Sequence, residues 1–556
     1  MRRSVSIRNV NVLYTATFLS LLGGSLLLAD LSLGWRVVIN QLVFLTVPLG
    51  IYVVVTGQHR NLRDHLRLHP VSWQVLALSL LIGAGLWRFD SGLAVLVNSV
   101  LDYTIPLPPE ALNVTVVDRV AMIVGVVLLA PVIEELLFRG VIQSAYESGC
   151  PIGAIVATSV LFVMIHQELA QSVAIVPVAL ALGYVTWRSG SVFPAIAIHF
   201  ANNAQAMLVA ALEGGRFGQL AFTPSASGAL IGGLIAIVAL WLFTRLTPRP
   251  VPERERSRGR WLARHWPILP VVPIYLFAIG TGVVLGVYPE ALAFGERLEL
   301  THAPWNEEVR WDYEIRNALD ETVGDAACSL RPGPAFFGLS CSMEQAAYEV
   351  DAPSGFFQQE AMTQRHEVRW DRERLALVEG KMEATFSEGA DQVTIEAVVV
   401  DGAMDVSVDG REEVEQGFED CYELPRSEAT EEAVSMEAPC RVDDALVAGG
   451  GIISPLMVGE WPWRLSALPF ELLHSRKVSL VWPYRSVEGV DGRAPARAET
   501  ILVVRTAEQV VTPAGEFVTW RVTVGDRYTA WYTVESPHTL VAYSDEVVTW
   551  QLTRIE

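Results

Sequence analysis

Residues 119–147 read RVAMIVGVVLLAPVIEELLFRGVIQSAYE, an almost unbroken apolar run that is interrupted near its middle by Glu134, Glu135 and Arg139. A helix needs about 20 apolar residues to cross a bilayer. A charged side chain inside a bilayer is costly unless it faces other protein or a water-filled cavity. The run therefore predicts a membrane-spanning helix whose charged side chains face the interior of a helical bundle.

Eight further apolar runs predict more helices of the same kind. They are residues 10–29, 37–56, 73–97, 151–167, 170–187, 191–212, 227–246 and 267–287. The third run along the chain is the weakest because Arg88 and Asp90 interrupt it, and a short span followed by an interfacial stretch is the alternative there. We expect a polytopic all-α transmembrane bundle of about eight or nine spans.

The charge balance of the chain reverses near Tyr288. Residues 1–287 contain 19 Arg, no Lys and 13 Asp or Glu, a net charge of +6, whereas the remaining 22 basic and 49 acidic residues give −27. A segment so rich in charge cannot lie in hydrocarbon. We therefore expect two domains, a membrane-embedded bundle in 1–287 and an acidic domain in 288–556, and no basic surface for a nucleic-acid partner.

The placement of arginines predicts the orientation, because cytoplasmic loops retain positive charge. With nine spans, the loops 58–70 and 245–264 fall on the side of the N-terminus and carry three and seven arginines. The loops on the other side carry Asp102, Glu110, Asp118 and Glu213 instead. We expect an integral, multi-pass cell-membrane protein with a cytoplasmic N-terminus and an extracytoplasmic C-terminal domain.

The acidic domain carries strand and disulfide signals. Residues 500–505, 517–524 and 528–534 alternate apolar and polar side chains, and turn-forming residues separate them, which predicts a mainly β, antiparallel fold. The short separations of the pairs Cys328–Cys341 and Cys421–Cys440 would allow two local disulfides in an oxidising compartment. Four unpaired thiols are the alternative.

The carboxylates in the run 119–147 divide by helical periodicity. Residues four apart share one face of a helix, so Glu135 and Arg139 can neutralise each other. Glu134 is rotated about 100° from its neighbour and can point elsewhere into the bundle. Glu134 is therefore the better candidate for chemistry.

Two other apolar runs contribute imidazoles. His166 follows Phe162 by four residues, and His199 precedes Asn203 by four, which places an imidazole and an amide side by side. Counting the helical rise from the intervening turns puts Glu134 and both imidazoles at levels that can match if the first turn protrudes from the bilayer. We expect these groups to converge in one pocket.

In this order, the three clusters resemble the motifs of the CAAX prenyl endopeptidase and bacteriocin-processing superfamily, often called CPBP or Abi. The resemblance covers about residues 121–211. It implies that 1–287 is a CPBP-type peptidase bundle and that the chain is an intramembrane endopeptidase. It also implies a catalytic set of Glu134, His166, His199 and Asn203 with Glu135 and Arg139 in support, and we interpret Phe162 as a packing residue beside the site.

Peptide hydrolysis needs an activated water, a stabilised oxyanion and a proton donor for the leaving amine. In a metal-free mechanism Glu134 takes a proton from a water held by His166, and His199 with Asn203 donates hydrogen bonds to the oxyanion. In the alternative, Glu134, His166 and His199 hold a zinc ion with water in the open position, as the classification of the family as metallopeptidases implies. The sequence leaves both mechanisms open. The expected substrate is a membrane-associated or lipid-modified peptide.

Two other functions would use the same residues. A non-catalytic membrane receptor or immunity protein would use the polar side chains only to hold helices together. A transporter would use the buried carboxylate as a proton relay, but the sequence lacks the paired half-helices or inverted repeat that are typical of transporters.

Overall fold

The computed structural model describes residues 6–28, 31–101, 103, 109, 115–147, 150–212, 226–247, 264–288, 297–300, 303–352, 355–359, 361–386, 391–401, 403–409, 421–424, 434–436, 440, 445–447, 460–486, 493–525, 527–545 and 547–556. The chain folds as two compact units, the first formed by 1–105 and 110–287 and the second by 288–556 together with 106–109. Each unit is described by itself below.

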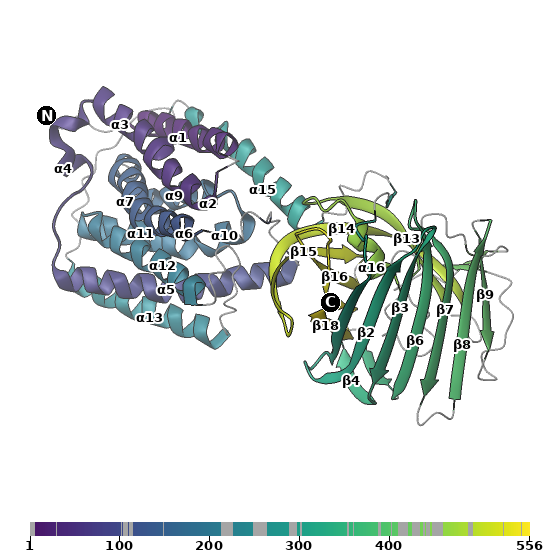
Figure 1. The fold of residues 1–556 in the computed structure, drawn as a ribbon. Coiled ribbons are helices and arrows are strands. Elements are labelled where there is room, and N and C mark those ends of the chain that lie inside the picture. Colours follow the sequence, from purple (N-terminus) through teal and green to yellow (C-terminus); the bar gives the residue numbers. More distant parts are fainter. Residues whose placement is uncertain are drawn as a thin grey trace. The chain divides into compact units, whose positions relative to one another are not determined.

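The first unit is a bundle of helices (Figure 1). Helices occupy all nine apolar runs of the sequence. They are α1 (Ile7–Leu27), α2 (Leu33–Ile39), η1 (Asn40–Leu45), α3 (Thr46–Val55), η2 (Gln58–Asn61), α4 (Leu62–His65), α5 (Trp73–Leu101), α6 (Val116–Ile123), η4 (Val124–Leu129), α7 (Ala130–Glu135), η5 (Leu136–Ile142), α8 (Gln143–Tyr146), α9 (Pro151–Met164), α10 (Leu169–Ala174), α11 (Val176–Ser189), α12 (Phe193–Leu212), α13 (Ala226–Leu246), η6 (Trp266–Ile268) and α15 (Val271–Val287).

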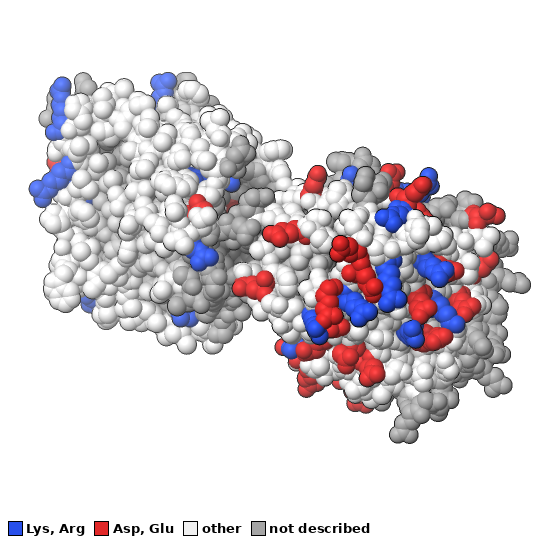
Figure 2. Space-filling view, viewed as in Figure 1, with Lys and Arg blue, Asp and Glu red and all other residues white. Residues whose placement is uncertain are grey.

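Six helices in the described part of the chain are long and apolar enough to cross a membrane. They are Ile7–Leu27, Leu33–Val55, Trp73–Leu101, Val116–Tyr146, Ala226–Leu246 and Trp266–Val287. Figure 2 shows few charged side chains on the visible face of this unit, as expected for a surface in contact with lipid. An apolar helical first unit is therefore confirmed, while the total of eight or nine spans stays a prediction.

The third run forms the predicted helix without the alternative interfacial stretch, and the sixth run differs from its prediction. The third run is one continuous helix, α5, because Asp90 is only 6% exposed and is buried against neighbouring helices rather than placed at an interface. The close packing rests on glycine, since a Cβ at Gly83 would collide with the carbonyl oxygen of Ile198 in α12. The sixth run is broken into α10 and α11, and Pro177 lies in the first turn of α11, where proline is tolerated.

The second unit is built on a 16-stranded sheet (Figure 1). Its strands and those of a separate hairpin, β4–β5, are β1 (Val309–Asn317), β2 (Thr322–Pro332), β3 (Phe336–Gln345), β4 (Tyr348–Ala352), β5 (Gly355–Gln359), β6 (Met362–Asp371), β7 (Leu377–Phe386), β8 (Asp391–Val400), β9 (Ala403–Asp409), β10 (Cys421–Glu423), β11 (Val434–Met436), β12 (Ala445–Val447), β13 (Ser475–Ser486), β14 (Arg493–Thr512), β15 (Gly515–Val524), β16 (Tyr528–Thr533), β17 (Leu540–Ser544) and β18 (Val548–Ile555).

Antiparallel pairing dominates the sheet. The strand order is β11-β10-β14-β15-β16-β17-β18-β1-β2-β3-β6-β7-β8-β9, so the last strand pairs with the first and joins the two ends of the unit. Only β10 with β14 and β12 with β13 run parallel among the described strands. The predicted mainly β, antiparallel second domain is confirmed in this form.

Aromatic residues and a disulfide hold the second unit together. The short helix α16 (Trp461–Arg464) buries two tryptophans, and the Tyr532 hydroxyl donates a 2.6 Å hydrogen bond to the carbonyl of Pro462. Cys328 and Cys341 lie opposite each other on β2 and β3 and form a disulfide. Cys440 is also disulfide-bonded.

Some predicted features lie outside the described residues. They are the side chain of Cys421, most of the arginine-rich loop 245–264, and Asp102, Glu110 and Glu213. The pairing of Cys421 with Cys440 and the orientation of the chain therefore stay predictions.

Candidate active site

Helix α7 brings two adjacent carboxylates into the interior of the first unit. The side chains of Glu134 and Glu135 are buried, with residue exposures of 7% and 0%. Because adjacent residues of a helix point about 100° apart, the two carboxylates have different partners. Glu134 Oε1 accepts a 2.7 Å hydrogen bond from Nε2 of Gln41, whereas Glu135 contacts Arg139 and His199.

Glu135 and Arg139 form a fully buried ion pair, as their four-residue spacing predicts. Arg139 Nε lies 3.2 Å from Glu135 Oε2, and neither side chain is exposed. The guanidinium also donates to the carbonyl of Ala179 at 3.2 Å and lies 4.3 Å from the centre of the Phe162 ring. Burying two charges is tolerated when both are paired and hydrogen-bonded. The Glu135–Arg139 pair carries no net charge and supports the neighbouring side chains of the site.

The carboxylate of Glu135 fixes the tautomer of His199. His199 Nδ1 lies 2.9 Å from Glu135 Oε1. An ionised carboxylate can only accept a hydrogen bond, so Nδ1 carries the proton and the neutral ring leaves Nε2 as a bare acceptor. The helix α12 thereby presents one defined nitrogen to the site.

His166 is held in the same way by a different acceptor. Its Nδ1 lies 3.0 Å from the backbone carbonyl oxygen of Phe162, which likewise cannot donate. The ring of His166 therefore also leaves Nε2 bare. The two imidazoles are thus locked in one tautomer by two unrelated oxygens.

Phe162 packs between the charged and imidazole groups. Its ring is 2% exposed and its centre lies 5.1 Å from that of His166 and 5.8 Å from that of His199. The Phe162 side chain offers no hydrogen bond, so its contacts with both imidazoles are packing contacts.

A tight turn places His166 at the end of α9. The next residue, Gln167, adopts a left-handed backbone conformation with φ of 53°, which is uncommon outside glycine. Glu168 then caps α10 by accepting hydrogen bonds from the backbone N–H groups of Ala170 and Gln171 at 2.8 and 2.5 Å. The backbone on both sides of His166 is therefore fixed.

Asn203 has a different partner from the one that its spacing suggested. Its Nδ2 donates a 2.8 Å hydrogen bond to the backbone carbonyl of Val126 in η4, while His199 bonds to Glu135. The amide nitrogen carries two hydrogens, so one N–H of Asn203 remains to donate to another group.

Three of the predicted residues lie near the imidazole of His166. Glu134, His199 and Arg139 all lie close enough to the imidazole of His166 to act on it electrostatically. Asn203 lies one helical turn beyond His199 on α12. Residues from two other apolar runs therefore lie within electrostatic range of His166, while their shared catalytic role stays a prediction.

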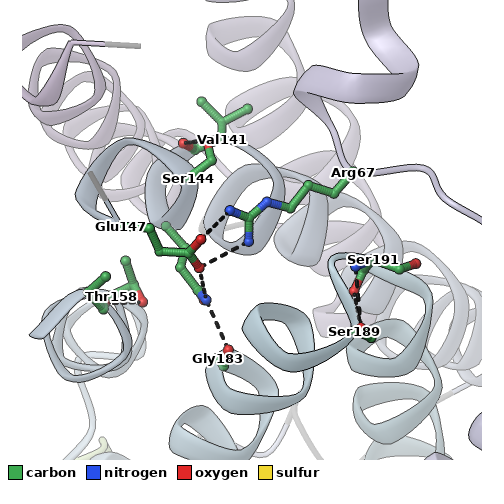
Figure 3. Close-up of polar contacts among 10 residues, drawn as sticks. Arg67, Val141, Ser144, Glu147, Thr158, Gly183, Ser189 and Ser191 are labelled. Atoms are coloured by element: carbon green, nitrogen blue, oxygen red, sulfur yellow. Dashed lines mark hydrogen bonds and ion pairs between the residues drawn. The ribbon is translucent and has the colours of Figure 1, made fainter. Parts of the chain in front are cut away.

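The helix that carries the carboxylates is fastened along its length. One turn beyond Arg139, Gln143 Nε2 donates to the carbonyl of Gly183 at 2.9 Å and to Glu147 at 2.8 Å. Glu147 in turn receives two hydrogen bonds from the guanidinium of Arg67, at 2.5 and 3.1 Å (Figure 3). These contacts fix Val116–Tyr146 against α11 and against the segment before α5.

Three π-helical segments, η1, η4 and η5, each bring a group to the site. They carry Gln41, the Val126 carbonyl and Arg139 respectively. A π-helical turn holds more residues than an α-helical one and re-aims side chains, and such turns are frequent at functional sites. Gln41 is not among the residues predicted from the sequence, although a glutamine inside the apolar run 37–56 was a usable signal.

The side chains do not form a ready zinc site. A catalytic zinc takes three protein ligands and an open position. Within the described part of the chain, no three His, Cys, Asp or Glu side chains group closely enough to hold an ion, and one oxygen of Glu134 is already engaged by Gln41.

The fold and the site together define a helical, apolar protein with a buried carboxylate–imidazole centre. Residues 116–205, which run from α6 into α12, match the family described as type II CAAX prenyl endopeptidase Rce1-like. This match confirms the family resemblance of the motifs and supports a peptidase. No curated protein and no solved structure matched the chain in the same comparisons.

Proposed function

We propose that the chain is an intramembrane endopeptidase that hydrolyses a peptide bond of a membrane-associated or lipid-modified substrate. The observation that carries this proposal is the meeting of the Glu134 carboxylate with two imidazoles that are each fixed with a bare Nε2. The family match at 116–205 supports the same reaction class.

The proposed reaction uses the groups as they lie. Glu134 takes one proton from water, while Nε2 of His166 accepts a hydrogen bond from the O–H that remains and so orients the hydroxide. The resulting hydroxide attacks the scissile carbonyl carbon, and the second N–H of Asn203 donates a hydrogen bond to the oxyanion. When the C–N bond breaks, Glu134 returns its proton to the leaving amine.

Substituting Glu134 by Gln tests the assignment. The amide keeps the shape of the side chain and can still accept from Gln41, but it cannot take a proton, so E134Q should abolish cleavage without unfolding the chain. One assay compares the peptides that wild type and E134Q release in membranes. A second assay compares their cleavage of an internally quenched, farnesylated CAAX peptide. Glu147→Gln is the matched control and should keep its turnover. Cleavage by E134Q would contradict the proposal.

The metal-free mechanism has its own test. We propose that turnover persists after incubation with a strong zinc chelator, because the base and the water-orienting nitrogen belong to the chain itself. Loss of turnover on chelation that added zinc restores would instead support zinc held by Glu134, His166 and His199.

A specific observation also favours the non-catalytic alternative. The contacts of Arg139 and Glu135 link α7, α11 and α12, as a purely structural polar network in a receptor or immunity protein would. A non-catalytic function predicts that E134Q lowers thermal stability. It also predicts that membranes with wild type contain no released peptide that is absent from membranes with E134Q.

We propose that the chain is a multi-pass membrane protein with its N-terminus in the cytoplasm and its second unit outside it. Support comes from the disulfides at Cys328–Cys341 and Cys440, since disulfides persist in oxidising compartments. The visible face of the second unit, which carries many Asp and Glu side chains (Figure 2), suits an aqueous environment. A lipid-modified substrate could then reach the site from the bilayer.

A further inference from the structure

Gln41 donates a hydrogen bond to Glu134 and lies outside the residues of the family match. It lies in η1, on the second helix of the chain, and is 7% exposed. Its Nε2 is 2.7 Å from Glu134 Oε1. A buried amide at this distance restricts the rotation of the carboxylate and leaves Oε2 as the oxygen of Glu134 that Gln41 does not engage.

The chemistry of the pair assigns the orientation of the Gln41 amide. A carboxylate accepts hydrogen bonds, so the NH₂ group of Gln41 must face Glu134. The amide oxygen, Oε1, then points elsewhere. It is buried and has no hydrogen-bond partner among the residues that the structure describes. Buried polar atoms are normally paired with protein, water or ligand, so this acceptor calls for a partner.

The backbone around Gln41 is held by its own π-helical turn. The carbonyl oxygen of Gln41 receives the backbone N–H of Thr46, five residues later, and also the Thr46 hydroxyl at 2.8 Å. Two donors on one carbonyl fix the start of η1. The side chain of Gln41 is therefore aimed by the local fold and not only by its bond to Glu134.

We propose that Gln41 is a positioning residue for Glu134 and that its Oε1 accepts a hydrogen bond from a backbone N–H of the bound peptide. This inference rests on the proposed function. A peptide entering the site brings N–H groups that lose water on burial and need acceptors. Oε1 is an unpaired acceptor beside the proposed base, so Gln41 sets both the register of the substrate and the oxygen that meets the water.

Two substitutions test the inference. Gln41→Met is similar in volume but removes both the donor and the acceptor, and Gln41→Asn keeps both groups with a shorter reach. The matched control is Gln58→Met, because Gln58 is also a buried glutamine, 6% exposed, but bonds to the Tyr52 hydroxyl. The probe is the farnesylated, internally quenched CAAX peptide or, if wild type does not cleave it, the membrane peptide that wild type but not E134Q releases.

We expect Q41M to lower kcat on the order of 10- to 100-fold, the range for one hydrogen bond to a charged group, and to raise KM about 5-fold or more for the lost neutral bond. Q41N should change both constants in the same direction by less, and Q58M should change neither. Melting temperatures of Q41M and Q58M in detergent should be alike, which separates positioning from folding. If Q41M fails to fold and Q58M does not, the kcat and KM of Q41N decide whether Gln41 positions Glu134 and contacts the peptide.

The outcomes separate this inference from the proposed function. If the Gln41 variants have a lowered kcat and an unchanged KM, the proposed contact between Gln41 Oε1 and the peptide is overturned. The partner of Oε1 would then be a water molecule. Wild-type kcat and KM in both Gln41 variants, with E134Q inactive, would overturn the inference and leave the proposed function standing. Turnover by E134Q, or no cleavage by wild type, would overturn the proposed function itself.

Discussion

Substituting Arg139 by Met probes the charge pair on which the site rests. Arg139 and Glu135 are both fully buried and 3.2 Å apart, and their attraction at an effective dielectric constant of about 20 is about 5 kcal/mol. Removing one partner of a buried pair leaves the other charge uncompensated and typically costs about 3–5 kcal/mol. We expect R139M to lower the free energy of unfolding by about that amount.

Thermal or denaturant unfolding of the purified chain in detergent measures the loss. The double variant Glu135→Gln with R139M removes the orphaned carboxylate, so it should recover at least half of the lost stability. Arg67→Met is the control, because Arg67 and Glu147 are 15% and 17% exposed (Figure 3) and a pair nearer the surface contributes about 1 kcal/mol or less. A loss in R139M no larger than in R67M, or a double variant no more stable than R139M, would refute the reasoning.

Three further predictions follow from other parts of the chain. Burial raises the pKa of Asp545 from 3.8 to about 6, so the folded unit favours the protonated carboxyl. The free energy of unfolding should therefore fall as the pH rises from about 4 through 6. The total loss is up to about 3 kcal/mol, since one pKa unit corresponds to about 1.4 kcal/mol. Asp545→Asn should remove that slope in unfolding followed by tryptophan fluorescence, and an unchanged slope would contradict the prediction. Gly83→Ala should destabilise the first unit by about 1–3 kcal/mol, because the added methyl group pushes α5 from α12. Gly50→Ala is the control, because its added Cβ meets no atom within 4 Å. Equal melting temperatures of the two variants would contradict this prediction. Cys150 is an exposed free thiol in the described part of the chain. It should react with a membrane-impermeant maleimide only after cells are opened. Labelling of Cys150 in intact cells would contradict the proposed orientation with a cytoplasmic N-terminus.

The features that the sequence predicted well are those that repeat along one helix or strand. A four-residue spacing was enough to predict the Glu135–Arg139 pair, because helix geometry alone puts such residues on one face. Strict alternation likewise predicted the strands now seen as β15 and β16. Both signals depend only on neighbours in the chain.

Features that depend on partners from elsewhere in the chain were missed. The helix at 73–97 was predicted, but the burial of Asp90 within it was not, because that burial depends on neighbouring helices. The bond from Gln41 to Glu134 joins residues 93 positions apart, and no local pattern encodes it. The π-helical segments also leave no clear mark in the sequence, because one additional residue in a turn does not change the apolar composition of a run.

The contacts of the two histidines show what a sequence motif does and does not specify. The motif residues name the reactive groups, but the atom that each group offers is set by an oxygen: the Glu135 carboxylate for His199 and the Phe162 carbonyl for His166. For Glu134 that role falls to Gln41, on a helix outside the matched segment. A chain could therefore keep every motif residue and still lose the site if η1 returned to a regular α-helical turn, because Gln41 would then be aimed away from the carboxylate that it holds.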